Sequence, residues 1–427
     1  MQVFWIIIYN LFLYPIFFTG ACVGALFNQK LRKGIKGRWN THSQLLSFKN
    51  RVSNNANVYW FHAASHGEFE QLKPILEGLK EVEPSAVFIV SFFSPSGFTN
   101  VVDSHIDCKI YLPFDFPWTV LKVFKLICPK KIIFAEYDVW PNMVWIAKLK
   151  NIPTTIFSVH FSNYTPKLFP VIRNFYRTVY GAFSHIYSET KSDYEKVQRL
   201  IGTNAIPKVK VLGNPRYDQV KKKTDQFTEK RTLSVLLRKK RIIAGSVWKE
   251  DEDVILQPLT RFLKEDKSAA LIWVPHEPNQ NNIDRAYEYF TSVGLTTIVH
   301  TEKNIQISEK EQVVIIGAVG ILSSLYWNGQ LAYVGGGFST GVHNVMEPAI
   351  ARLPVLFGPK FDNSHAAKEL ILEYGGYSIT SSEEFRSKLD SVFTDKNFFL
   401  RSSFSATNVI HKNLGSSTRI VRAIIKD

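Results

Sequence analysis

Short apolar runs rich in β-branched and aromatic residues alternate along this chain with longer amphipathic stretches. In the first half, the runs that predict strands lie at 57–63, 87–93, 131–136, 154–160 and 185–189. The stretches 67–82 and 140–150 have apolar residues three or four positions apart, which predicts helices. Alternation of strands and helices is typical of a parallel sheet with helices on both faces, so the pattern predicts an α/β fold.

A second series of the same kind follows, with strands predicted at 241–245, 269–275, 313–317, 331–337 and 354–358. Residues 382–427 predict helices, and the last of them is expected to pack back across the linker. Between the two series, residues 221–241 contain nine basic and two acidic residues and lose the apolar periodicity. We therefore predict two doubly wound domains, 40–220 and 241–427, joined by a basic linker at 221–240. Ligands of such domains bind in a cleft at the carboxyl ends of the strands.

The N-terminal segment has no charged residue between Met1 and Phe27. That length suffices to cross a bilayer, for which about 20 apolar residues are needed. Five basic residues without an acid follow immediately, at Lys30, Arg32, Lys33, Lys36 and Arg38. By the positive-inside tendency they place the rest of the chain in the cytoplasm. Residues 1–28 are therefore predicted to be a membrane anchor.

Two other interpretations of this segment compete with a membrane anchor. A cleaved signal peptide carries its positive charges before the apolar stretch, whereas here they follow it. The sequence from Thr19 to Cys22 faintly suggests lipoprotein processing, but the missing N-terminal charge counts against that as well. Pro15 leaves a bent or monotopic segment open, and the sequence does not separate such a segment from a span.

The chain carries 52 Lys and Arg residues against 37 Asp and Glu, a net charge of +15. No acidic residue precedes Glu68, whereas seven basic residues do. Next to a bilayer, this charge would hold anionic lipid head groups. A solvated collar that only fixes topology accounts for the five residues nearest the anchor but less well for Lys49 and Arg51, which are predicted to hold an anionic lipid head group. Nucleic acid is excluded as the partner because the basic residues concentrate at the anchor and the linker and no reading motif occurs.

Composition limits the remaining possibilities. Hydrophobic residues make up 45% of the chain and charged residues 21%, which excludes a disordered protein. The three cysteines are too few and too scattered for a disulfide framework or a zinc ligand set. The composition therefore predicts a reducing compartment and no structural metal.

Three segments of the first predicted domain carry candidate chemistry. In HAASHGEFE (62–70), Glu68 falls in the first turn of a helix among small residues, which suits a carboxylate that removes a proton from a hydroxyl. The alternative is an ordinary helix-start glutamate. In EYDVWPN (136–142), Glu136 and Asp138 follow a strand, although Asp138 is also explained as a cap. In GNPRYD (213–218), Arg216 places a positive charge at a turn.

The second predicted domain contains GGGFSTGVHNVMEPAIARLPVLFGP at 335–359. Glycines follow a buried strand, and packing alone explains three in a row poorly. Backbone N–H groups at the helix start near His343 and Asn344 suit a phosphate, and Glu347 suits the two hydroxyls of a ribose. The segment is neither a dinucleotide glycine fingerprint nor a Walker loop. A second segment, AGSVWKEDED (244–253), opens a helix, and its acidic run is explained by the helix dipole.

These segments resemble, in order and spacing, the 3-deoxy-D-manno-octulosonic acid (Kdo) transferases of lipopolysaccharide and lipid A synthesis. The residues that carry the resemblance are AASHGE, YLPFD at 111–115, EYDVWPN, GNPRYD and GVHNVMEPA with PVLFGP. The resemblance extends from the anchor to about Lys368. The His-Asn-x-x-Glu-Pro segment alone is shared with many two-domain glycosyltransferases, whereas AASHGE directly after an anchor points to this family.

The resemblance implies a GT-B fold, in which two Rossmann-like domains face a cleft. The first would bind the lipid acceptor and the second CMP-Kdo. It implies transfer of Kdo, with inversion, to the 6′ hydroxyl of the anionic lipid A precursor (lipid IVA) at the cytoplasmic side of the inner membrane. No cofactor or metal is expected, because backbone dipoles and a basic side chain can stabilise the single leaving phosphate.

The resemblance also implies roles for individual residues, with Glu68 as the general base. The acceptor and cleft residues would be Ser65, Gly67, Asp115, Glu136 and Arg216. The donor-binding residues would be Ser246, Lys249, His276, Gly337, His343, Asn344 and Glu347, the last holding the ribose. The chain departs from the family pattern at Val342, where a glycine is usual, and at 274–278, where an arginine is missing. Lys249 and His276 are the candidate replacements for that cation.

Two other functions are weighed against this one. A different membrane-bound GT-B transferase would keep Glu347 but would not need Glu68. A non-catalytic solute-binding protein also has two α/β domains around a cleft. Such proteins are normally exported, which conflicts with the basic residues after the anchor.

Overall fold

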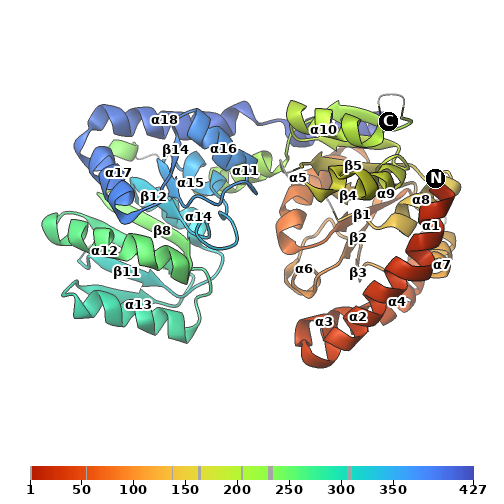
Figure 1. The fold of residues 1–427 in the computed structure, drawn as a ribbon, viewed down its shortest axis with the longest axis horizontal. Helices are drawn as coiled ribbons and strands as arrows, with labels where there is room; N and C mark the ends of the chain where they lie inside the picture. Colours follow the sequence, from red (N-terminus) through yellow and green to blue (C-terminus); the bar gives the residue numbers. More distant parts are fainter. Residues whose placement is uncertain are drawn as a thin grey trace. The chain divides into compact units, whose positions relative to one another are not determined.

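The computed structural model describes residues 2–53, 55–136, 138–161, 165–202, 205–228, 234–304, 307 and 310–427. They form two compact units (Figure 1). One comprises Met1–Gln219 with Gly415–Asp427, and the other comprises Val220–Leu414. Each unit is built on a seven-stranded sheet whose paired strands are all parallel. The predicted α/β fold class with two doubly wound domains is confirmed.

The first sheet has the strand order β3-β2-β1-β4-β5-β6-β7. Its strands are β1 (Val58–Ala63), β2 (Val87–Phe92), β3 (Cys108–Tyr111), β4 (Lys131–Ala135), β5 (Thr154–Val159), β6 (His185–Ser188) and β7 (Lys208–Val211). The helices after the N-terminal segment are α4 (Thr41–Lys49), α5 (His66–Val82), α6 (Pro95–Asn100), α7 (Pro117–Ile127), α8 (Pro141–Leu149), α9 (Pro170–Tyr180) and α10 (Lys191–Ile201), with a short 3₁₀ turn, η2 (Pro166–Leu168). The order reverses between β1 and β4, which makes their carboxyl ends the topological switch point.

Side chains of the central strands alternate between two hydrophobic cores, one on each face of this sheet. Trp60 of β1 joins a core with α4, α7, α8, α9 and α10. Its neighbour Phe61 joins the core on the other face, with α5 and the C-terminal helix α19 (Ser416–Lys426). Because both faces are covered, the strands read as continuous apolar runs, which is why the sequence revealed them.

The N-terminal segment is a helix that contains one π-helical turn. It runs through α1 (Gln2–Ile8), η1 (Tyr9–Leu13) and α2 (Tyr14–Phe27), and α3 (Gln29–Trp39) follows after a turn at Asn28. Among the described residues it is the one helix long and apolar enough to cross a membrane. Pro15 has no N–H to donate, which weakens the helical ladder beside the π-turn. The wider turn places Tyr9 and Tyr14, five positions apart, on the same face, where both are buried.

The second sheet has the order β10-β11-β9-β8-β12-β13-β14 and reverses between β8 and β12. Its strands are β8 (Arg241–Val247), β9 (Ala270–Pro275), β10 (Thr297–His300), β11 (Val313–Ile316), β12 (Leu331–Val334), β13 (Val355–Phe357) and β14 (Gly376–Ser378). Helix α11 (Arg216–Thr228) begins in the first unit and ends in the second. The other helices and turns of the second unit are η3 (Val235–Leu237), α12 (Lys249–Glu265), α13 (Gln280–Ser292), α14 (Leu322–Leu325), η4 (Tyr326–Asn328), α15 (Met346–Ile350), α16 (His365–Leu372), α17 (Ser382–Thr394) and α18 (Lys396–Lys412).

The limits of the compact units differ from the predicted domain boundaries. The predicted linker, 221–240, falls within the second unit, although its residues 229–233 lie outside the described part of the chain. Val235 packs into the core of the second sheet, and the buried Arg238 donates to the carbonyl oxygens of Gly329 and Ala351. Apolar burial and hydrogen bonds therefore fix residues 235–240 in the second unit. The basic composition of the segment gave no sign of this packing.

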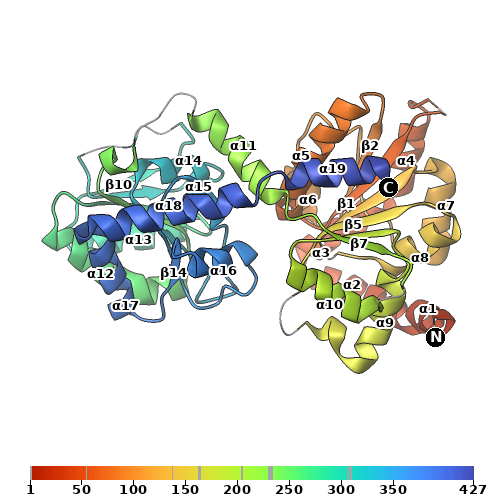
Figure 2. The ribbon, with the colours of Figure 1, turned by 90° about the horizontal axis from the view of Figure 1, so that it is seen from above.

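The C-terminal residues 415–427 belong to the first unit, whereas the prediction placed them in the domain 241–427. Helix α19 lies beside α5 and buries Ile420, Val421 and Ile424 against the first sheet (Figure 2). The Asp218 carboxylate accepts hydrogen bonds from the N–H groups of Gly415 and Ser417, which fixes the start of the helix. The predicted return of the last helix is thus found, and it completes the core of the first domain.

This packing predicts that α19 contributes to the stability of the first domain. Replacing the buried Ile420 with alanine leaves a cavity against α5, and we expect a loss of about 2–5 kcal/mol in the free energy of unfolding. The same change at Ile425, which is exposed on the same helix, should cost less than about 0.5 kcal/mol. Urea denaturation of the full chain, followed by tryptophan fluorescence, measures both. Equal effects at the two positions would contradict the assignment of α19 to this core.

Candidate functional site

The candidate residues of the first domain gather at the carboxyl ends of its parallel strands. Ser65, Gly67 and Glu68 follow β1, Glu136 follows β4, and β1 and β4 are neighbours at the switch point. Glu136 adopts a left-handed backbone with φ of 57°, which a non-glycine residue seldom adopts. The sequence order alone predicted this gathering, because the carboxyl ends of parallel strands meet at one edge.

Glu68 lies in the first turn of α5 and is half-buried. The Ser65 hydroxyl caps the helix by accepting from the Glu68 N–H at 3.4 Å. The Glu68 Oε2 in turn accepts from the Ala64 N–H at 2.6 Å. Burial, followed by the negative charges of Glu136 and Asp138, raises the pKa of Glu68 to about 8. A carboxylate with such a pKa is a stronger base than an exposed glutamate.

Glu136 and Asp138 are each held by a hydrogen-bond donor. The side-chain amide of Gln71, on α5, donates to Glu136 Oε1. The buried His62, on β1, lies with its Nε2 3.0 Å from Asp138 Oδ2. Its other ring nitrogen lies 3.0 Å from the hydroxyl of Ser91. This Ser91–His62–Asp138 chain resembles a hydrolytic triad, but Ser91 is fully buried within β2, so no substrate reaches its hydroxyl. This series of hydrogen-bonded side chains therefore orients Asp138.

A further carboxylate at this edge, Glu189 after β6, is not among the residues predicted from the sequence. Burial raises the pKa of Glu189 to about 7, and the charges of Asp193 and Glu136 act in the same direction. Asn214 hydrogen-bonds to it, and the same Asn214 accepts from the backbone N–H of Arg216. The GNPR segment thus lies at the end of β6. A glutamate directly after a buried strand was the available signal, as it was for Glu136.

Asp115 does not take the place at the ligand-facing surface that was predicted for it. It has no exposed surface, and its carboxylate accepts from the Tyr9 hydroxyl and from the N–H groups of Asn142 and Met143. Its own N–H donates to the Tyr14 hydroxyl. All these bonds are internal, so Asp115 joins the N-terminal helix to α8 and offers nothing to a ligand.

The basic residues are also distributed differently from the prediction. Arg51, which was expected to hold an anionic lipid head group with Lys49, lies with Asp107 and Cys108 beside the amino end of β3. That is the opposite end of the strands from Glu68. Arg38 and Lys30, which were counted as part of the collar, lie instead at the carboxyl edge beside Phe93 and Ser94, after β2.

In the second domain, three aromatic rings stack at the switch point. Trp248, at the start of α12, stacks on His276 with a centroid distance of 4.1 Å, and His276 stacks on His343 at 4.4 Å. The Trp248 Nε1–H donates to His343 Nε2 at 2.8 Å. Burial and then the neighbouring His276 lower the pKa of His343 to about 4, and burial lowers that of His276. His276 is therefore a poor replacement for the missing arginine, which leaves Lys249, at the exposed start of α12.

The glycines at 335–337 are explained by close packing, contrary to the expectation from the sequence. A Cβ atom on Gly335 would lie 2.2 Å from the carbonyl oxygen of Ser246, and one on Gly337 would lie 2.5 Å from the nitrogen of Gly358. The buried Asp251 accepts from the N–H groups of Trp248 and Gly336 and from the Tyr333 hydroxyl. The loops after β8, β12 and β13 therefore need glycine to pack against one another, whatever they bind.

The remaining donor-side candidates lie in the same loops. Ser246 has a left-handed φ of 55°, next to the register shift at the end of β8. Asn344 caps the N–H of Met346 with its side chain, and Glu347 lies in the first turn of α15, a helix of five residues. Lys360 follows β13 and donates to the carbonyl oxygens of Phe338 and Ser339, so it is a cation that the sequence analysis missed.

Within the described ranges, no group of three or more His, Cys, Asp and Glu side chains has an arrangement that could hold a metal ion. The independence of the site from metals and cofactors stays a prediction.

The similarity of this chain to known proteins extends over both domains. The family model described as 3-deoxy-D-manno-octulosonic-acid transferase matches residues 37–219. A Kdo transferase of Aquifex aeolicus is 27% identical over 82% of this chain and 89% of its own length. A Kdo transferase of Haemophilus influenzae is 24% identical over 85% of each chain. This chain is a homologue of the Kdo transferases. It is thus related to a family of glycosyltransferases.

Not every relative of this Kdo transferase homologue has the same extent. A bifunctional glycosyltransferase/methyltransferase of Fusobacterium nucleatum is 24% identical over 83% of this chain, which spans 56% of that protein's length. Among solved structures, the UDP-GlcNAc 2-epimerase of Neisseria meningitidis, bound to UDP-GlcNAc, matches with a TM-score of 0.61 at 12% identity over 87% of this chain and 100% of its own. That likeness shows the fold, which is the GT-B type.

The ring stack predicts how His343 of this Kdo transferase homologue titrates. Only a neutral imidazole can accept the hydrogen bond from Trp248, so the bond opposes protonation. Trp248→Phe keeps an aromatic ring but removes the donor, and we expect the pKa of His343 to rise. Titration of the histidine ring protons by NMR measures the shift. Trp327→Phe, which alters another tryptophan of the same domain, should leave His343 unchanged, and an unchanged pKa in Trp248→Phe would contradict the role of the bond.

Proposed function

We propose that this protein is an inverting glycosyltransferase that moves Kdo from CMP-Kdo to the 6′ hydroxyl of the lipid A precursor lipid IVA. The observation that carries the proposal is the match to Kdo transferases across both domains, with the Aquifex aeolicus relative covered over 89% of its length. The carboxylate edge of the first domain supports a reaction that needs one base. The loops at the switch point of the second domain support a nucleotide-sugar donor.

Glu68 is the proposed general base. Its carboxylate takes the proton of the acceptor hydroxyl while the hydroxyl oxygen forms a bond to the anomeric carbon of Kdo. The bond from that carbon to the phosphate oxygen breaks in the same step, and its electron pair leaves with cytidine monophosphate. One displacement by a single oxygen inverts the anomeric carbon. The raised pKa of Glu68 matches this role, because a base with a pKa near the working pH both accepts and releases a proton readily.

The donor would lie against the loops after β8, β12 and β13. Lys249 and Lys360 are the cations of these loops that can stabilise the leaving phosphate, together with backbone N–H groups. Glu347, beside the buried Tyr326, is the proposed partner of the ribose. No metal is needed in this scheme, because a monophosphate leaving group carries less charge than a diphosphate.

We also propose that the protein works at the cytoplasmic face of the inner membrane, with its N-terminal helix lying in the membrane surface. One side of that helix is fixed to the first domain, since Tyr9 and Tyr14 bond to Asp115 and Asn10 bonds to Asn142. The other side exposes apolar side chains. These are Val3, Phe4, Ile7, Leu11, Phe12, Ile16, Val23 and Leu26. A helix with one polar-bonded side and one exposed apolar side suits the interface better than a span surrounded by lipid.

Removal of the Glu68 carboxylate tests the reaction. We expect Glu68→Ala to lower the rate of Kdo transfer from CMP-Kdo by about 10²–10⁴, because a positioned base contributes that much. Glu81→Ala, at the exposed end of the same helix α5, should transfer at the native rate. Mass spectrometry of the lipid product made from defined lipid IVA and CMP-Kdo measures both. Native transfer by Glu68→Ala would show that another group is the base.

The pH profile of kcat/KM tests the cause of the raised pKa. The reaction needs ionised Glu68, so kcat/KM should rise about tenfold per pH unit below pH 8 and level off above it. Glu136→Gln removes a negative charge that opposes ionisation of Glu68, while Asp138 is unaltered. The pKa of Glu68 therefore falls, and the acidic limb of the kcat/KM profile should move to lower pH.

The matched control is Glu189→Gln, which removes a buried carboxylate from the same sheet edge at β6 and should leave the limb in place. If the limb stays at its original pH in Glu136→Gln, or moves upward, repulsion from Glu136 does not set the pKa of Glu68.

A further inference from the structure

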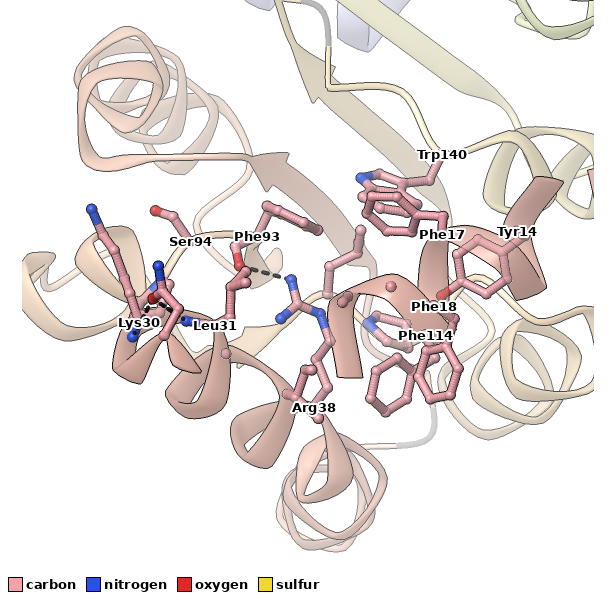
Figure 3. Close-up of a pocket in the computed structure, with 18 residues that line it drawn as sticks. Tyr14, Phe17, Phe18, Lys30, Leu31, Arg38, Phe93, Ser94, Phe114 and Trp140 are labelled. Atoms are coloured by element: carbon pink, nitrogen blue, oxygen red, sulfur yellow. Dashed lines mark hydrogen bonds between the residues drawn. The ribbon is translucent and has the colours of Figure 1, made fainter. Parts of the chain in front are cut away.

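A deep pocket lies between the N-terminal helices and the carboxyl edge of the first sheet (Figure 3). Helices α2 and α3 form one wall, and the segments after β2 and β3 and before α8 form the other. Its volume is about 620 Å³, which falls within the range of small-molecule sites. The pocket belongs entirely to the first domain.

The walls of the pocket are mainly apolar. Phe17 and Phe18 of α2 line it together with Leu31 of α3, and Phe114 and Trp140 face them from the sheet edge (Figure 3). Phe18 and Phe114 contact each other edge to face, with ring centroids 5.2 Å apart. Side chains of this kind hold a hydrocarbon chain by removing its surface from water.

Two cations line the pocket, Lys30 and Arg38, and Arg38 lies among the apolar side chains of its wall. Its guanidinium lies 4.4 Å from the centroid of the Phe93 ring and donates to the Phe93 carbonyl oxygen at 2.7 Å. Burial lowers the pKa of Arg38, although Asp138 and two tyrosines oppose the shift. No ion pair joins Arg38 to a carboxylate in the described part of the chain. A guanidinium that is desolvated but unpaired gains free energy from an anion, and its planar fork fits phosphate oxygens.

The pocket is continuous with the edge that carries Glu68. The N–H of Ser94, which lines the pocket, donates to the Ala64 carbonyl oxygen at 2.8 Å. The N–H of the same Ala64 donates to the Glu68 carboxylate. On the other side, Trp140 stacks on Phe93 at 5.1 Å and lies two residues after Asp138. An anion held at Arg38 would thus lie next to the candidate base.

We propose that this pocket takes one acyl chain of the lipid acceptor and that Arg38 binds an anionic phosphate of its head group. The inference rests on the proposed function, which requires an acceptor with both acyl chains and phosphates. The apolar side of α2 favours this occupant, because the same helix that would lie in the membrane surface also forms the pocket wall. We assign the hydrocarbon chain in the pocket to the acceptor. The experiment below distinguishes it from the chain of a bulk membrane phospholipid.

Filling the pocket tests the acyl-chain site. Gly20 lines the pocket, and a Cβ placed there meets no atom within 4 Å, so Gly20→Phe adds a ring without a clash at the backbone. Ala21→Leu is a second, smaller filling on the same helix. Val82→Phe is the control, because Val82 is exposed at the end of α5, lies outside the N-terminal helix and does not line the pocket. KM is measured for lipid IVA, for the same bisphosphorylated disaccharide without acyl chains, and for CMP-Kdo.

We expect the filled variants to raise KM for lipid IVA about tenfold or more, with KM for the deacylated acceptor and for CMP-Kdo unchanged. Val82→Phe should match the native protein for all three. An unchanged KM for lipid IVA, or an equal rise for both acceptors, would overturn the proposal. So would an equal loss of binding to phospholipid vesicles without acceptor, since the pocket would then hold bulk lipid.

Acceptors with and without phosphates test the role of Arg38. Arg38→Gln should raise KM for the bisphosphorylated acceptors about tenfold and leave KM for a dephosphorylated acceptor unchanged, and Arg38→Lys should fall between. Lys36→Gln, an exposed cation on the same helix α3, is the control. Thermal unfolding of each variant shows that the fold is kept. Equal effects on phosphorylated and dephosphorylated acceptors would overturn the role of Arg38.

A binding measurement separates the pocket from the proposed reaction. Lipid IVA with brominated acyl chains should quench the fluorescence of Trp140, seen as the difference between the native protein and Trp140→Phe, and Gly20→Phe should abolish that difference. If the native protein binds and quenches but transfers no Kdo, the proposed function fails and the pocket stands. If it transfers Kdo without quenching Trp140, the pocket assignment fails and the function stands.

Discussion

The buried carboxylate of Asp115 is the interaction on which the first domain's ligand-facing edge depends. It accepts from the Tyr9 hydroxyl and from two N–H groups at the start of α8, while its own N–H donates to Tyr14. Burial raises the pKa of Asp115 to about 7, so these donors compensate a carboxyl group that has lost its water. One residue thereby fixes the N-terminal helix, the loop after β3 and the start of α8. Ring contacts of Phe17 with Trp140 and of Phe18 with Phe114 then hold α2 in place as a wall of the pocket.

The second constraint is topological. Each sheet has a topological switch point, between β1 and β4 in the first and between β8 and β12 in the second, so the segments after these strands diverge and leave their carboxyl ends open. Glu68 and Glu136 lie at the first switch point, and Trp248 and the glycine loop lie at the second. The acidic edge of one domain and the basic and aromatic loops of the other therefore have the same structural origin. Their chemistry differs because the residues placed at equivalent strand ends differ.

All ten strands expected from the sequence are present, and the four that were missed, β3, β7, β10 and β14, are the four edge strands of the two sheets. Central strands are apolar on both faces and stand out, whereas an edge strand such as β10 is only partly buried and lacks that signal. Candidate residues directly after a central strand, such as Glu136, were predictable for the same reason. The burial of Asp115 and the positions of Arg38 and Arg51 were not, because they depend on how the N-terminal helices fold over the sheet, and the π-turn at Tyr9–Leu13 has no sequence periodicity to reveal it.

The cluster of carboxylates explains why a proton at this edge goes to Glu68. Glu136 and Asp138 are each within hydrogen-bond distance of a side chain on a neighbouring element, Gln71 on α5 and His62 on β1. Glu68 accepts one N–H and lies half-buried beside both carboxylates, so burial and their charges raise its pKa. With a pKa of about 8, roughly one Glu68 in ten is ionised at pH 7. The neighbouring carboxylates thus lower the ionised fraction of Glu68 and at the same time strengthen its carboxylate as a base.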